Sequence, residues 1–236
     1  MGGERRIQAS PIFFEDELMI RGIIFDFDDT LGNREDYAYK LYTEIISKYC
    51  TNELLRESIV QHCMIWDQNG NESKKYVQDM LRSVYTINLN MNLDTYWDDH
   101  LWEHTTLFKD AKETLMALKS RGYSLAIITN GKREGQMRKL EISGISRLVD
   151  VIVISEDCGY EKPDPQIFQN AADKLHLACN ECIYIGDTFA KDIRGSLEAG
   201  MEAIWFWPHG YRACNYPVTR ISDLSELLKM FEGKRG

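Results

Sequence analysis

The chain has 236 residues, of which 44% are hydrophobic and 28% charged, the composition of an ordinary soluble globular protein. Its formal net charge of −9 argues against a nucleic-acid polymer or an anionic membrane as a partner, because both require clustered Lys and Arg. No stretch reaches the roughly 18 to 20 apolar residues of a membrane span.

The amino-terminal segment, residues 1–18, is expected to be a loose arm. Its basic start is followed by a short apolar patch that the acids at positions 15–17 interrupt, which is unlike a signal peptide. Met19 is therefore a second candidate, beside Met1, for the natural start. Six cysteines are scattered without a disulfide framework, which favours reduced thiols and a cytoplasmic location.

The first expected strand is the apolar run over residues 20–25, which suits a strand covered on both faces. Asp26 and Asp28 follow it, and because strand side chains alternate, both project to the same side. Two adjacent carboxylates repel each other unless a cation is present or one is protonated, which indicates a functional site. By the same alternation Asp29 points away. The alternative interpretation is an acidic turn that closes the strand.

The next region is predicted to be helical, because apolar residues recur there at helical spacing. Turn-forming Asn-rich segments separate the expected helices. We therefore expect residues 33–106 to form an inserted helical domain, and residues 19–32 and 107–236 to form the main domain. The helical spacing covers segments 37–46, 54–60 and 76–84.

From residue 107 the pattern alternates between helices and strands, which is typical of an α/β fold with a doubly wound parallel sheet. In such a sheet ligands bind beyond the carboxyl ends of the strands. The expected helices cover 110–121, 134–142, 165–175 and 191–199, and the expected strands cover 123–128, 151–154, 182–185 and 203–207.

Polar residues also stand at the ends of the later strands. Each of them has a plainer interpretation when taken alone, as a turn, a surface lysine or a helix N-cap. Together they would meet the acid pair at one edge of the sheet. These residues are Thr129 and Asn130 after one strand, Lys162 on the loop after the next, and Asp187 with Asp192 after a third.

In this order, and with a helical insertion after the first, these segments resemble the four motifs of the haloacid dehalogenase-like (HAD) superfamily over roughly residues 20 to 235. The resemblance implies a Rossmann-like core and the hydrolysis of phosphoric monoesters. It implies that Asp26 attacks phosphorus and becomes an aspartyl phosphate. Asp28 would protonate the leaving alkoxide and then accept a proton from the hydrolytic water.

The resemblance also implies a Mg²⁺ cofactor, an ion that prefers hard oxygen ligands together with substrate phosphate. Its ligands would be the carboxylates of Asp26 and Asp187 and the backbone carbonyl of Asp28. Asp192 would hold metal-bound water from the second layer of residues. The phosphate would be bound by the Thr129 hydroxyl, the Asn130 backbone N–H and the Lys162 ammonium.

The helical insertion lies between the first and second motifs, and in this the chain resembles the members of the superfamily that have a helical C1-type cap. An acid at position 28 favours phosphate substrates, because dehalogenating members lack an acid there. Segments 28–31, 128–131 and 153–156 look most like the branch containing 5′-nucleotidases and N-acylneuraminate 9-phosphatase.

We therefore expect a Mg²⁺-dependent phosphatase for a small phosphorylated metabolite, of the nucleotide or sugar phosphate type, acting as a monomer or homodimer. A phosphomutase of the same superfamily is an alternative. A non-catalytic binding or regulatory protein with the same fold is an alternative from another class, against which the intact Asp26 and Asp28 argue.

Two further patterns have plainer interpretations. Residues 100–104 match the His-x-x-Glu-His pattern of inverted zinc proteases, but no downstream Glu ligand is framed by a matching helix, so we expect the surface of a helix. Trp66, Trp97 and Trp102 could line a substrate face, although aromatics at helical spacing are more often core residues.

Overall fold

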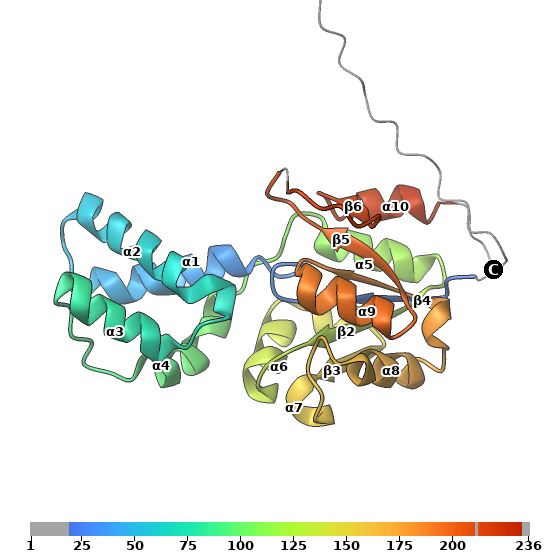
Figure 1. The fold of residues 1–236 in the computed structure, drawn as a ribbon, viewed down its shortest axis with the longest axis horizontal. Helices are drawn as coiled ribbons and strands as arrows, with labels where there is room; N and C mark the ends of the chain where they lie inside the picture. The colour runs from blue at the N-terminus through green and yellow to red at the C-terminus, as the bar shows by residue number, and fades with distance from the viewer. Residues whose placement is uncertain (1–18, 211, 233–236) are drawn as a thin grey trace, which may run out of the picture.

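The structure is a computed structural model that describes residues 19–210 and 212–232. A parallel sheet with flanking helices forms one part, and a group of helices beyond the edge of the sheet forms the other (Figure 1). The predicted arm over residues 1–18 lies outside the described residues. Among the helices that the structure describes, none is both long and apolar enough to cross a membrane.

Within the described ranges the strands form one six-stranded parallel sheet in the order β3-β2-β1-β4-β5-β6. The register sets Phe25 of β1 beside Ile127 of β2 and Ile185 of β4, so β1 is central. The strand order runs in opposite directions on either side of β1, which opens a crevice beyond its carboxyl end. The predicted doubly wound α/β fold is confirmed. The strands are β1 (Gly22–Phe25), β2 (Ser124–Thr129), β3 (Val151–Ile154), β4 (Cys182–Gly186), β5 (Glu202–Phe206) and β6 (Thr219–Ile221).

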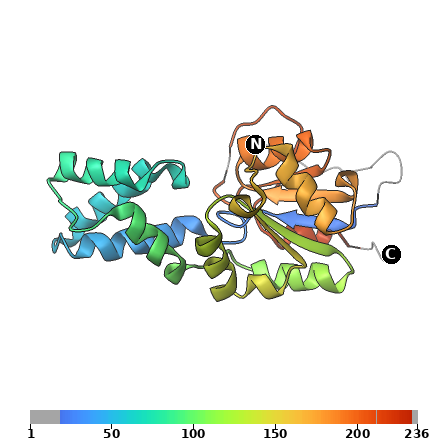
Figure 2. The same cartoon turned by 90° about the horizontal axis from the view of Figure 1, so that it is seen from below.

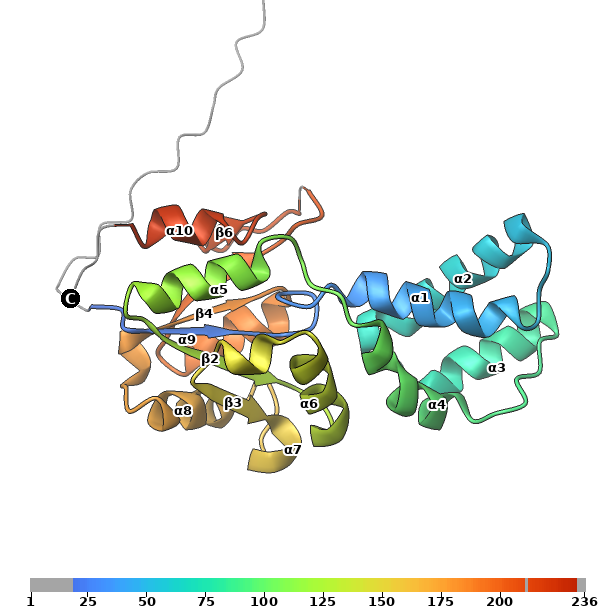
Figure 3. The ribbon, with the colours of Figure 1, turned by 180° about the vertical axis from the view of Figure 1, so that it is seen from behind.

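Helices cover both faces of the sheet (Figure 3). Because side chains alternate along β1, Phe25 enters the core formed with α5 and α10, while Ile24 enters the core formed with α8. This two-sided burial explains why the strands are continuous apolar runs. The helices are α5 (Ala111–Ser120), α6 (Arg133–Ile142), α7 (Ser155–Cys158), α8 (Pro165–Lys174), α9 (Arg194–Glu198) and α10 (Glu226–Met230).

The inserted helices pack around a hydrophobic core of their own, which contains Tyr42, Leu81 and Trp97. An Asn or Ser side chain caps the start of each helix by accepting a hydrogen bond from a backbone N–H of the first turn. Figure 2 shows this bundle beside the sheet, to which it is joined at one end. Its helices are α1 (Arg34–Ser47), α2 (Glu53–Asp67), α3 (Lys74–Tyr85) and α4 (Leu93–His100), followed by a 3₁₀ turn over Leu101–His104.

The chain enters and leaves the bundle through two adjacent segments. Asn33 N–H donates to the Thr106 carbonyl at 2.9 Å, and Phe108 N–H donates to the Leu31 carbonyl at 2.9 Å. We propose that the bundle, residues 33–106, is a cap domain, and that residues 19–32 and 107–236 form the main domain.

Two of the predicted helical segments have different bounds in the structure. The helix expected at 191–199 begins earlier, with a π-helical turn over Phe189–Ile193 that leads into α9. The helix surface expected at residues 100–104 is divided between the last residue of α4 and the 3₁₀ turn. His100 and His104 pair there with Glu103 and Glu44, respectively.

Candidate active site

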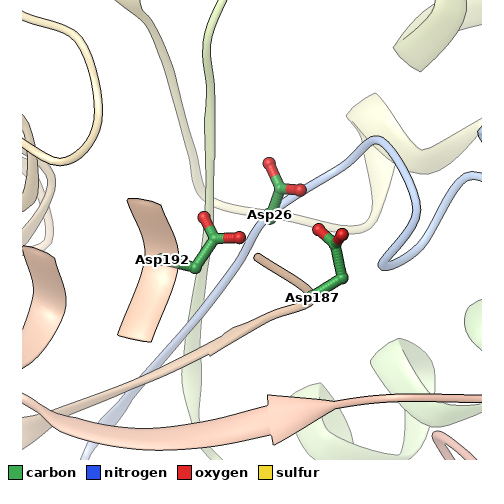
Figure 4. Close-up of side chains that lie close together, drawn as sticks. All are labelled: Asp26, Asp187 and Asp192. Carbon is green, nitrogen blue, oxygen red and sulfur yellow. The ribbon is translucent and has the colours of Figure 1, made fainter. Parts of the chain in front are cut away.

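Three buried or partly buried carboxylates meet beyond the carboxyl ends of β1 and β4. Asp26 directly follows β1, Asp187 directly follows β4, and Asp192 lies in the π-helical turn Phe189–Ile193. Each offers a carboxylate oxygen within 4.8 Å of the other two, and Figure 4 shows the three side chains grouped together. The predicted meeting of separate segments at one sheet edge is what the structure shows.

Lys162 is the cation at this cluster. Its buried Nζ lies 2.5 Å from Asp26 Oδ1, 2.7 Å from Asp192 Oδ1 and 3.1 Å from the Tyr184 hydroxyl. Burial alone would lower the pKa of Lys162, but the carboxylates of Asp192 and Asp26 outweigh it and raise the pKa above its ordinary value. Lys162 therefore stays positively charged beside Asp26.

The loop that carries Lys162 is fixed by Asn130. The Asn130 side chain accepts from Lys162 N–H at 2.8 Å and donates to the Lys162 carbonyl at 3.0 Å. Thr129, the last residue of β2, is buried and lines the same cleft. The three residues predicted to bind phosphate thus line one cleft, and the Asn130 side chain also holds the backbone of Lys162 in place.

Gly186 allows the close approach of Asp192. A Cβ atom at position 186 would lie 2.5 Å from Cβ and Cγ of Asp192, so only glycine fits there. Asp192 Oδ2 accepts from Thr188 N–H at 2.9 Å, and Oδ1 accepts from Lys162 Nζ at 2.7 Å and from the Tyr184 hydroxyl at 3.2 Å. The Gly-Asp sequence at the end of β4 is therefore explained by packing as well as by chemistry.

Burial and mutual repulsion disfavour the charged forms of Asp26 and Asp187. Burial raises the pKa of Asp26 to about 7; Lys162 opposes this effect, and the Asp192 carboxylate adds to it. Burial, together with the charges of Asp192 and Asp26, also raises the pKa of Asp187 well above its usual range. A divalent cation would neutralise this repulsion, and the all-oxygen donor set suits Mg²⁺. The residues present therefore fit the Mg²⁺ ion that the motif resemblance implies.

Asp28 lies beside this cluster and is held from two sides. Lys139 of α6 places Nζ 2.6 Å from both carboxylate oxygens, and Gln136 Nε2 donates to Oδ2 at 3.1 Å. The Tyr37 hydroxyl of α1 donates to Oδ1. Burial would raise the pKa of Asp28, but the charge and hydrogen bond of Lys139, the hydrogen bond from Tyr37 and the charge of Arg34 outweigh it and lower the pKa to about 2.

Asp29 does not follow the alternation expected for a strand, because β1 ends at Phe25 and Asp29 adopts a positive φ of 61°. Its side chain lines the same cleft as Asp28, but Oδ1 accepts from Glu35 N–H at 3.0 Å near the start of α1. Burial raises the pKa of Asp29 to about 6. Asp29 thus stabilises the turn that leads into α1 by accepting this hydrogen bond.

A cleft of about 970 Å³ lies over these groups, between the sheet edge and the helical bundle. Arg34, Lys74, Trp97 and Trp102 line it on the bundle side. Trp66, the third tryptophan predicted as a candidate for a substrate face, packs partly buried against the core of the bundle. Sequence reasoning missed Lys139, Gln136 and Tyr37. For Gln136 and Lys139 the sequence offers one indication: they stand three residues apart, which places two polar side chains on the same face of a helix, the face that is buried.

The chain belongs to the haloacid dehalogenase-like hydrolase family, whose model matches residues 23–206. It is similar to glyceraldehyde 3-phosphate phosphatase of Methanothermobacter thermautotrophicus, with 30% identity over 79% of this chain and 85% of the relative. It is also similar to N-acylneuraminate-9-phosphatase of Rattus norvegicus, with 26% identity over 91% of this chain and 96% of the relative.

Among solved structures, the chain resembles the HAD-hydrolase YfnB of Bacillus subtilis, determined bound to magnesium. The TM-score is 0.73 at 25% identity, and the match covers 91% of this chain and 99% of that chain. The resemblance predicted from the motifs is confirmed.

Proposed function

We propose that the chain is a Mg²⁺-dependent phosphatase that hydrolyses phosphomonoesters of small metabolites through an aspartyl phosphate at Asp26. The observation that carries this proposal is the grouping of Asp26, Asp187, Asp192 and Lys162 at one sheet edge, with Asp28 beside them in the same cleft. The relatives named glyceraldehyde 3-phosphate phosphatase and N-acylneuraminate-9-phosphatase support a small phosphorylated substrate.

Asp26 is the proposed nucleophile. Its carboxylate oxygen forms a bond to phosphorus while the bond from phosphorus to the ester oxygen breaks. The neighbouring Lys162 ammonium balances negative charge on the phosphoryl oxygens, together with the Thr129 hydroxyl and the Asn130 backbone N–H. Water then attacks the aspartyl phosphate and releases inorganic phosphate.

Asp28 is the proposed proton carrier. It gives a proton to the leaving alkoxide in the first step and takes one from the attacking water in the second. The contact with Lys139 favours the carboxylate form, which is the form that the second step requires. The negative charge of an arriving phosphate would raise the pKa of Asp28 and favour the acid form for the first step.

The proposed Mg²⁺ ligands are the carboxylates of Asp26 and Asp187 and the backbone carbonyl of Asp28. Asp192 is proposed to hold metal-bound water and, through its contact with Lys162, to orient the ammonium. When bound, the ion supplies positive charge that polarises the phosphate. The crowding of buried carboxylates supports this assignment, because such a group is most stable with a cation among them.

The helical bundle is proposed to close over the substrate and exclude water from the leaving-group side. Arg34, Lys74, Trp97 and Trp102 line that side of the cleft and are the residues from which substrate selection would come. We further propose a cytoplasmic location. It is supported by the six cysteines, all of which lie in the described part of the chain as free thiols.

The test is phosphate release from 4-nitrophenyl phosphate by the purified full chain with Mg²⁺. We expect turnover that EDTA abolishes and that Asp26→Asn removes. A screen across nucleotides, sugar phosphates and sugar-acid phosphates would then define the substrate class. Transfer of phosphate between positions of a sugar without net release would instead identify a phosphomutase, and turnover that survives Asp26→Asn would refute the assigned nucleophile.

A further inference from the structure

Lys139 forms a close, buried ion pair with Asp28 in the cleft beside the carboxylate cluster. Its Nζ lies 2.6 Å from both oxygens of Asp28, a two-pronged contact that fixes the plane of the carboxylate as well as its position. The side chain of Lys139 is 6% exposed and that of Asp28 is 22% exposed. Both residues line the cleft, and the carboxylate is the more exposed of the two.

Burying a lysine is costly, and the surroundings of Lys139 indicate what offsets the cost. Nζ lies 5.7 Å from the ring centres of both Phe27 and Tyr37, a distance at which aromatic faces attract a cation. Within the described residues, Asp28 is the acid with which Lys139 forms its ion pair. The buried charge is thus directed at one carboxylate.

Gln136 connects this pair to the predicted phosphate-binding loop. Its Nε2 donates to Asp28 Oδ2 at 3.1 Å and to the Asn130 carbonyl at 2.9 Å. Gln136 and Lys139 are both buried and lie three residues apart, on one face of α6. One helix therefore supports both Asp28 and the loop beside it.

We propose that Lys139 is a positioning residue that sets the orientation of Asp28 for proton transfer to the leaving group, an inference that rests on the proposed function. In this role Lys139 acts through Asp28 and not through a contact with the substrate. Without it, the Asp28 side chain gains rotational freedom and keeps only the donors Gln136 and Tyr37. Proton transfer requires hydrogen-bond geometry, so the loss of orientation slows cleavage of those esters whose leaving group must be protonated.

The experiment compares Lys139→Met with the wild type on phosphomonoesters of graded leaving-group acidity: 4-nitrophenyl phosphate, phenyl phosphate and an alkyl phosphate. The measured quantity is kcat/KM, which reports the steps up to release of the leaving group. We expect a loss of about tenfold or more for the alkyl ester, within the range that a general acid contributes, and about threefold or less for the nitrophenyl ester. Lys139→Arg, which keeps a two-pronged cation, should recover part of the alkyl activity.

The inhibition constant of inorganic phosphate separates positioning from direct binding, and should change by less than about twofold in Lys139→Met. Arg138→Met is the matched control, because Arg138 neighbours Lys139 on α6 but lies over the Trp102 ring and pairs with Glu134. It should keep the wild-type dependence on the leaving group. Melting curves of each variant identify losses that come from unfolding.

A loss in folded Lys139→Met that is equal for all three esters, or a tenfold weaker inhibition by phosphate, would overturn the positioning role. If Lys139→Met does not fold, Lys139→Gln, which also removes the cation, supplies the same comparison, and Lys139→Arg remains the variant that should recover activity. A wild-type chain that leaves 4-nitrophenyl phosphate intact would overturn the proposed function and this inference with it. Wild-type turnover with an unchanged leaving-group dependence in the variant would overturn this inference alone.

Discussion

Nζ of Lys162 lies 2.5 Å from Oδ1 of Asp26, so the proposed nucleophile faces a buried positive charge. We expect Lys162→Met to lower kcat by on the order of 100-fold to 1000-fold, the range for loss of one group that stabilises transition-state charge. Lys174→Met, at an exposed position on α8, is the control and should keep wild-type kcat. Steady-state phosphate release measures both variants, and wild-type kcat in Lys162→Met would contradict the assigned role.

Asp28 and Asp187 are expected to fail in different ways when each is changed to Asn. Asp28→Asn should lower kcat on an alkyl phosphate by about 100-fold to 10,000-fold, the range for loss of a general acid and base. It should keep most of the rise in Tm that Mg²⁺ causes, because its proposed metal contact is the backbone carbonyl.

Asp187→Asn should lose most of the rise in Tm that Mg²⁺ causes, because the Asp187 carboxylate is a proposed metal ligand. Thermal melts with and without Mg²⁺ measure the difference. An equal Mg²⁺ effect in the two variants would show that the metal is bound elsewhere.

The stability of the metal-free protein should fall as the pH rises through the range in which the buried acids titrate. The folded-state pKa of Asp26 is about 7 against an ordinary value of 3.8, and that of Asp187 is raised as well. A raised pKa favours the protonated form in the folded state. The stability that these two protonated acids contribute is therefore fully present below their ordinary pKa. It is lost as the pH rises through their folded-state pKa.

Mg²⁺ competes with protons for these carboxylates, so the rise in Tm on adding Mg²⁺ should be larger at about pH 8 than at about pH 5. Asp28 does not contribute in this window, because its folded-state pKa is about 2. Melts in EDTA and in excess Mg²⁺ across this range provide the test. A Mg²⁺ effect that does not depend on pH would contradict the proposed ligands.

Asp67 should be essential for the stability of the helical bundle. It is buried between Arg34, whose Nη2 lies 2.7 Å from Oδ2, and Lys74, which contacts Oδ1. Asp67→Asn leaves two buried cations without their carboxylate, so we expect the free energy of unfolding to fall by about 3 to 5 kcal/mol.

The matched control is Asp79→Asn, which removes the exposed pair with Lys75 in the same bundle and should cost less than about 1 kcal/mol. Urea titrations of both variants give the comparison. Similar losses in the two variants would mean that the buried cluster is not what stabilises the bundle.

The parallel strands were predictable because strands buried on both faces are continuous apolar runs. The predicted strand 151–154 has the bounds of β3. The strand β6 and the helices α4 and α10 were not predicted as elements. They are short, and only part of each is buried, as the burial of Leu227 alone in α10 illustrates.

The site could be predicted where its residues follow strand ends, since parallel strands bring those positions together whatever the rest of the chain does. Asp26, Thr129 and Asp187 are of this kind. The partners of Asp28 are different. Lys139 reaches it from α6 and Tyr37 from α1, and their meeting depends on how those helices pack against the sheet edge. Sequence periodicity shows which face of a helix is buried but not what it meets.

The central claim, that Asp26 carries the phosphoryl group, is tested most directly by intact-protein mass spectrometry of Asp28→Asn after acid quenching of a reaction with 4-nitrophenyl phosphate and Mg²⁺. Nitrophenolate leaves without protonation, whereas hydrolysis of the intermediate is slowed when Asp28 is lost, so the intermediate should accumulate. The account predicts one added phosphoryl group, located on Asp26 by fragmentation and absent when Asp26→Asn is added. A phosphoryl group on another residue, or the same adduct in the double variant, would contradict it.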